Sequence, residues 1–169
     1  MTAAEVRQRR AEAAERYQPD KIRLLLVAQA PRDADDRYFY FPDVAEHDWV
    51  FRAVTQAILP HAGRTRTNKA SLLAELHDRG VFLIDLKPDP IVNSQTSRPE
   101  LRPHVPGLMV RIAELEPERI ILIKTDVYDV AYPALAAAGL PVSTVRIPFQ
   151  SSGRQTEFAV AFGRALAGE

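Results

Sequence analysis

Four short runs of apolar, largely branched residues are the clearest signal in the hydrophobic pattern of the chain. They occupy residues 22–28, 81–86, 119–124 and 142–147. Their length and β-branched content predict strands, and their near-continuous apolar character indicates that both faces of each strand are buried. This pattern is typical of a parallel sheet.

Helical patterns separate these runs. We expect helices over residues 3–16, 46–59, 68–79, 105–115, 126–139 and 155–167. Asn68 is a suitable N-cap, Gly80 suits the position after a helix end, and Pro133 is expected to split or kink its helix. Alternating strands and helices predict one α/β domain over residues 1–169: a three-layer α/β/α fold with a four-stranded parallel sheet, preceded by a helical extension at 1–20.

The composition narrows the class of protein. Of 169 residues, 46% are hydrophobic and 26% charged, and 22 Lys and Arg balance 22 Asp and Glu. These values are typical of a globular domain, and they argue against a strongly cationic nucleic-acid coat protein without excluding a local basic groove. No apolar run approaches the roughly 18 residues of a membrane span, so we expect a cytoplasmic protein with no membrane partner.

The residues that commonly hold metals are scarce. The chain has no cysteine, which excludes disulfides, thiolate zinc sites and iron–sulfur clusters, and its four histidines show no metal-binding spacing. We therefore predict no metal and no cofactor. An acidic cluster is interpreted as a solvated loop rather than a magnesium site; its members are Asp33, Asp35, Asp36 and Asp43.

The segments that follow the strands are expected to carry function, because parallel sheets bind ligands beyond their carboxyl ends. Gln29 follows the first strand in a tight exit that ends at Pro31. Four consecutive aromatic residues come next, of which Phe39 and Phe41 are candidates to stack on a flat heterocycle. The same rings are equally suited to cap the hydrophobic core.

Asp85 lies near the end of the second predicted strand, in an otherwise apolar run. It is either a structural ion-pair partner of Lys87 or a site residue with a raised pKa. Asn93, in the loop beyond, is a turn former or a ligand contact.

The turn before the last helix combines small polar residues with a positive charge: Ser151, Ser152, Gly153 and Arg154. Backbone N–H groups at a helix N-terminus bind anions, so this turn is a candidate phosphate site. The alternative is an ordinary serine-capped helix.

Taken together, these motifs resemble those of the uracil-DNA glycosylase-like superfamily, from about residue 21 onward. The segment LLLVAQAP resembles the first motif, with Gln29 and Pro31 in register, and VFLIDLKPDP and IPFQSSGR resemble the later ones. The resemblance implies a sheet-based glycosylase fold in which Phe39 or Phe41 stacks a flipped base. Asp85 stands where the family often has Asn.

Two departures from the family pattern bear on activity. Gln29 and Ala30 supply neither the carboxylate nor the asparagine of the first motif, and the histidine of the last motif is missing. The leading hypothesis is a divergent hydrolase that cleaves an N-glycosidic bond in DNA or a nucleobase-containing small molecule, with Gln29 and Asp85 as catalytic residues. The alternatives are a binding module that does not cleave and a small-molecule hydrolase or transferase of the same fold. The sequence does not indicate an oligomeric state.

Overall fold

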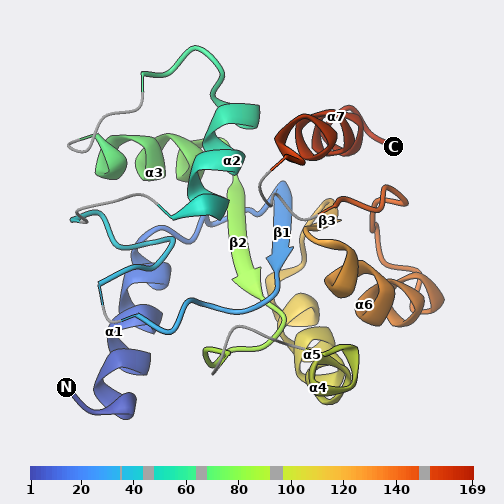
Figure 1. The fold of residues 1–169 in the computed structure, drawn as a ribbon, viewed down its shortest axis with the longest axis horizontal. Coiled ribbons are helices and arrows are strands. Elements are labelled where there is room, and N and C mark those ends of the chain that lie inside the picture. Colours follow the sequence, from blue (N-terminus) through green and yellow to red (C-terminus); the bar gives the residue numbers. More distant parts are fainter. Residues whose placement is uncertain (35, 44–47, 64–67, 92–96, 149–152) are drawn as a thin grey trace.

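Three parallel strands form the sheet at the centre of the protein (Figure 1). The computed structural model describes residues 1–169 apart from 35, 44–47, 64–67, 92–96 and 149–152. Strand β1 (Leu24–Ala28) lies in the middle, between β2 (Val81–Asp85) and β3 (Ile120–Leu122). Because both of its faces are covered, Leu25, Leu26 and Val27 are fully buried.

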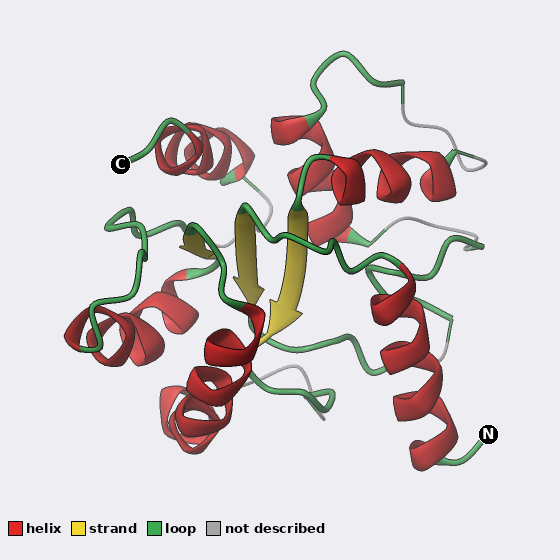
Figure 2. Ribbon diagram, turned by 180° about the vertical axis from the view of Figure 1, so that it is seen from behind, coloured by secondary structure: helices red, strands yellow, loops and turns green. Residues whose placement is uncertain are grey.

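Helices surround the sheet, consistent with the predicted three-layer arrangement. In Figures 1 and 2, α2, α3 and α7 form one group and α4, α5 and α6 form another. In the described part of the chain, no helix combines the length and the apolar character that crossing a bilayer requires. The helices are α1 (Ala3–Arg16), α2 (Trp49–Ile58), α3 (Lys69–Asp78), α4 (Arg98–Leu101), α5 (Val105–Leu115), α6 (Thr125–Ala137) and α7 (Gln155–Leu166), with a 3-10 turn, η1 (Arg102–His104).

The predicted fourth strand is not formed in the described part of the chain. Between 142 and 147, only Val142 pairs with the sheet, through one parallel bridge to Ile120. The hydroxyl of Ser143 accepts a hydrogen bond from the N–H of Val145, which in a strand would point to a neighbouring carbonyl. Val145 and Ile147 are nevertheless buried. The apolar pattern of residues 142–147 therefore reflects burial and not strand pairing.

Of the two outcomes expected at Pro133, a split or a kink of its helix, the split does not occur. Helix α6 continues through Pro133 to Ala137. A proline removes one backbone hydrogen bond from a helix. Here the buried side chains of Val127, Ala131 and Leu135 hold both halves of the helix against the core.

Gly80 ends α3 as predicted, with a positive φ of 74°. A Cβ atom at this position would lie 2.9 Å from the Cγ of Arg23 and 3.0 Å from the carbonyl oxygen of Lys21. Glycine is therefore required both by the backbone conformation and by the close approach of the chain before β1.

Helix α1 supports the segment that leaves β1. Arg10 is buried on its inner face, and its Nη2 donates to the carbonyl oxygens of Arg32 (2.9 Å) and Ala34 (3.2 Å). The first helix thereby fixes the loop that follows Gln29.

A tyrosine hydroxyl covers the open edge of β2. Tyr40 Oη accepts from the N–H of Leu83 at 2.7 Å and lies 3.1 Å from the Leu83 carbonyl, to which it donates. Since β2 is an edge strand, these two backbone groups would otherwise be buried without partners. Burial also raises the pKa of Tyr40 well above its ordinary value, so the hydroxyl keeps the proton that it donates.

We predict that Tyr40→Phe lowers the free energy of unfolding by about 2–4 kcal/mol, because it leaves two buried backbone groups unsatisfied. Urea denaturation measures the change. Tyr17→Phe is the matched control, since the Tyr17 ring stacks on Tyr40 at 6.2 Å and its hydroxyl has no hydrogen bond in the described structure. Equal losses in the two variants would contradict the assigned role of the hydroxyl.

Candidate functional site

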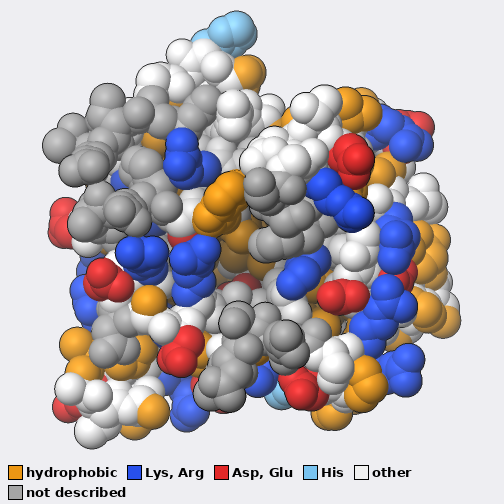
Figure 3. Space-filling model, viewed as in Figure 1, with side chains coloured by type: hydrophobic (Ala, Val, Ile, Leu, Met, Phe, Trp, Pro, Cys, Tyr) orange, Lys and Arg blue, Asp and Glu red, His pale blue; other side chains and the backbone are white. Residues whose placement is uncertain are grey.

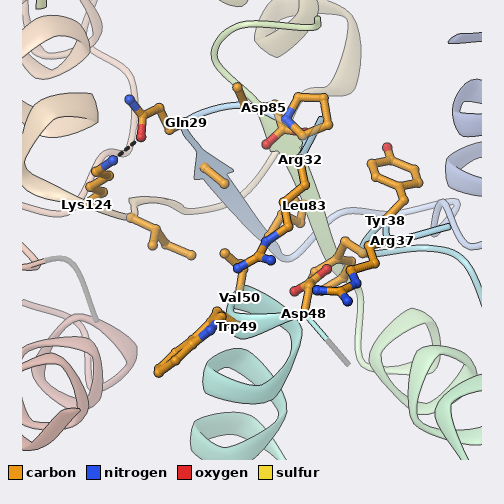
Figure 4. Close-up of a pocket in the computed structure, with 15 residues that line it drawn as sticks. Gln29, Arg32, Arg37, Tyr38, Asp48, Trp49, Val50, Leu83, Asp85 and Lys124 are labelled. Atoms are coloured by element: carbon orange, nitrogen blue, oxygen red, sulfur yellow. Dashed lines mark hydrogen bonds between the residues drawn. The ribbon is translucent and has the colours of Figure 1, made fainter. Parts of the chain in front are cut away.

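A cavity of about 200 Å³ opens at the carboxyl ends of the three strands (Figure 4). Its walls come from the exit of β1, the aromatic segment, the start of α2, one face of β2 and the end of β3. The lining residues are Ala28, Gln29, Ala30, Pro31, Arg32, Arg37, Tyr38, Phe39, Asp48, Trp49, Val50, Leu83, Asp85, Ile123 and Lys124.

Strand register brings the two predicted catalytic residues together. Ala28 of β1 pairs with Asp85 of β2, so Gln29 leaves its strand beside Asp85. Side chains alternate along a strand, so Leu83 and Asp85 share the face that borders the cavity. The cavity wall brings Gln29 and Asp85 together with Phe39, which is distant from both in sequence.

Asp85 is the most perturbed carboxyl group of the site. Burial raises its pKa from 3.8 to about 7, the negative charge of Asp48 adds to this effect, and the guanidinium groups of Arg111 and Arg10 oppose it. Arg111 donates to the backbone carbonyls of Asp85 (2.8 Å) and Leu86 (3.1 Å), so it fixes the strand end. The structure records no ion pair between Asp85 and Lys87, and Asp85 is a cavity residue.

Lys124 is a cavity residue that sequence reasoning missed. It was included in the apolar run 119–124, whereas β3 ends at Leu122 and Lys124 precedes α6. Its backbone has φ 84° and ψ 138°, a conformation that residues other than glycine rarely adopt. Nζ of Lys124 donates to Oε1 of Gln29, and burial lowers the pKa of this amine.

The aromatic segment contributes to both the core and the cavity. Phe39 borders the cavity with 5% of its surface exposed and packs edge-on against Phe51, with ring centroids 5.4 Å apart. Tyr38 also lines the cavity and is partly exposed. Phe41 lies elsewhere, in a surface hollow beneath the guanidinium of Arg9, which is 4.4 Å from its ring centre.

The mouth of the cavity carries charged residues and one exposed ring. Asp48 caps α2 by accepting from the N–H of Phe51 at 2.6 Å, and Figure 4 shows the Arg37 side chain beside it. Trp49 is 43% exposed, and Arg32 is exposed as well. Figure 3 shows Lys and Arg side chains gathered around an apolar patch near the start of α2.

A buried lysine supports the cavity from behind. Lys69 is 1% exposed; its Nζ donates to the carbonyl oxygen of Tyr38 at 2.8 Å and lies 4.7 Å from the ring centre of Phe51. Burial lowers its pKa to about 8, against the opposing effect of Asp48. The contact ties the first residue of α3 to the aromatic segment.

The remaining predicted site residues are not among the described residues that line this cavity. Asn93, Ser151 and Ser152 lie outside the described residues. Gly153 and Arg154 are exposed and do not line the cavity, and the Gly153 N–H donates to the side chain of Gln155 at 3.2 Å. Where the structure describes the chain, it contains no group of three His, Asp or Glu placed to hold a metal ion.

Comparison of the chain with models of protein families and with curated proteins finds no match.

Backbone strain at Lys124 predicts that two variants of this residue differ in stability. Lys124→Gly and Lys124→Ala both remove the amine, but only glycine adopts a φ of 84° without steric cost. We expect the glycine variant to be more stable than the alanine variant by about 1–3 kcal/mol, measured by urea denaturation. Equal stabilities would show that the backbone at this position is not strained.

The raised pKa of Asp85 predicts that the stability of the protein depends on pH. The raised pKa means that the folded state binds this proton more tightly than the unfolded state, so stability falls as pH rises from about 4 to about 7. Asp85→Asn removes the cost of burying the ionised carboxylate. We therefore expect the free energy of unfolding of this variant, relative to that of the wild type, to rise by a few kcal/mol between pH 4 and pH 8. Unfolding curves across this range measure the gap, and a gap that stays constant with pH would contradict the assigned pKa.

Proposed function

We propose that the cavity binds a nucleobase and that the protein hydrolyses the N-glycosidic bond joining this base to its sugar. The observation that carries the proposal is Asp85, a carboxyl group with a pKa of about 7, beside an amide and an aromatic wall at the carboxyl end of a parallel sheet. A carboxyl group of this pKa is suited to general acid–base catalysis near neutral pH.

The cavity walls suit a flat, polar ligand. Phe39 and Tyr38 supply apolar ring surface, and Gln29 supplies an amide. Lys124 donates to Oε1 of Gln29 and so fixes which side of the amide carries the two Nε2–H donors. Those donors are suited to a carbonyl oxygen of a base, where negative charge develops as the base departs.

In the proposed reaction, ionised Asp85 accepts a proton from a water molecule while the water oxygen bonds to C1′ of the sugar. The C1′–N bond breaks and the base leaves with the bonding electron pair, to be protonated afterwards. Removal of a general base of this kind typically lowers a rate by about 10²–10⁴-fold.

The cavity also favours a second candidate, a protein that binds the base without cleaving it. No histidine is among the described residues of the cavity, and Gln29 and Ala30 supply no carboxylate in the first of the motifs that resemble the family. Its volume of about 200 Å³ is below the roughly 300–1,000 Å³ of pockets for larger ligands, which suits a single base.

The test is base release from single- and double-stranded oligonucleotides containing uracil, hypoxanthine or xanthine, at low salt. We expect the wild type to release one of these bases at a rate that rises with pH up to about 7, as Asp85 ionises. Asp85→Asn is expected to lose at least 100-fold. Asp89→Asn, an exposed residue paired with Arg7, is the control and should retain the full rate.

Trp49, the only tryptophan of the chain, separates the two candidates. A change in its fluorescence on adding the oligonucleotide, without base release, would favour binding alone. An Asp85→Asn variant as fast as the wild type would remove Asp85 from the reaction, and absence of both signals would refute a nucleobase ligand.

A further inference from the structure

Lys124 has a backbone conformation that is rare for a residue other than glycine. Among the described residues, only Glu116 and Lys124 have a positive φ without being glycine. Glu116 ends α5 in an ordinary left-handed conformation, at φ 47° and ψ 52°. Lys124 has the more extended φ 84° and ψ 138°, and its side chain lines the cavity. Conformations of this kind persist where the surrounding structure enforces them, often at functional sites.

The amine of Lys124 borders the cavity and is partly desolvated. It donates a hydrogen bond to Oε1 of Gln29, and burial lowers its pKa with partial opposition from Asp126. Lysines desolvated in this way form Schiff bases with carbonyl compounds.

We propose that Lys124 forms an imine with the open-chain C1′ aldehyde of an abasic sugar and thereby gives the protein a lyase activity. The inference rests on the proposed function, because base release produces this sugar. Nζ attacks C1′, and loss of water leaves a protonated C1′=N imine. A base then removes the C2′ proton, its electron pair forms the C2′=C3′ bond, and the C3′–O bond breaks as the 3′ phosphate leaves. Water finally hydrolyses the imine and restores the amine.

Asp85 is the group of the same cavity that is suited to remove the C2′ proton. Its carboxylate is at the end of β2 and Lys124 follows β3, so the two approach the cavity from strands on either side of β1. Lys69 is not an equivalent nucleophile, because it is 1% exposed, does not line the cavity and holds the Tyr38 carbonyl.

Borohydride trapping tests the inference, because it reduces an imine to a stable amine. The intact protein is mixed with a single-stranded oligonucleotide that carries one chemically preformed abasic site, with sodium borohydride added. We expect a covalent adduct that survives denaturing electrophoresis and maps to the peptide containing Lys124. Without borohydride, we expect cleavage on the 3′ side of the abasic site.

The chain has only four lysines, at positions 21, 69, 87 and 124, so the controls are nearly complete. Lys124→Arg keeps the charge and should lower the adduct yield at least tenfold. Lys124→Gly removes the amine and relieves the backbone strain at this position. It should lower the adduct yield as much as Lys124→Arg does. Lys21→Arg and Lys87→Arg should trap as the wild type does, since Lys21 pairs with Glu118 on the surface and neither lines the cavity.

The preformed abasic site separates this inference from the proposed function. Base release by the wild type with no adduct would overturn the imine and leave the hydrolase proposal standing. An adduct that maps to Lys124, without base release, would support the imine and refute the hydrolase. An adduct that persists in Lys124→Arg, or that maps to Lys69, would overturn the assignment of Lys124.

Discussion

The hydroxyl of Tyr40 on the edge of β2 is the contact on which the shape of the cavity depends. By bonding both backbone groups of Leu83, it occupies the position that a further strand would take. The aromatic segment is thereby held against the sheet, with Phe39 forming a cavity wall and the Tyr38 carbonyl facing Lys69. An edge strand left open would have no such wall and would expose unpaired backbone groups.

Burial then acts on two groups of opposite charge in the same cavity. It raises the pKa of Asp85 and lowers the pKa of Lys124, so both groups are shifted toward their neutral forms. The cost of ionising the buried Asp85 carboxyl group and the strained backbone of Lys124 both lower the stability of the folded protein. Destabilising features of this kind, collected at one end of a sheet, are typical of a site maintained for chemistry rather than for stability.

Some elements of the fold can be predicted from the sequence and others cannot, for physical reasons that differ between them. The three strands of the sheet were predicted because continuous apolar runs are needed wherever both faces of a strand are buried. Gly80 was predicted because a positive φ at a helix end excludes most other residues. Residues 142–147 were predicted as a strand and are not one, since Ser143 satisfies the Val145 N–H locally while the apolar residues remain buried. Phe41 was grouped with Phe39, although the two side chains lie in different hollows.

The alternating α/β order, the buried strands and the position of Gln29 and Asp85 at strand ends could be predicted from the sequence alone, because hydrophobic periodicity is a local property of the chain. Three features are visible only in the folded protein: Lys124 lines the cavity, Tyr40 covers the edge of β2, and Lys69 donates to the Tyr38 carbonyl. Each of these depends on a contact between segments far apart in the chain, or on a backbone conformation that the residue type does not favour. The pKa of a side chain likewise depends on desolvation by distant segments, which no local pattern encodes.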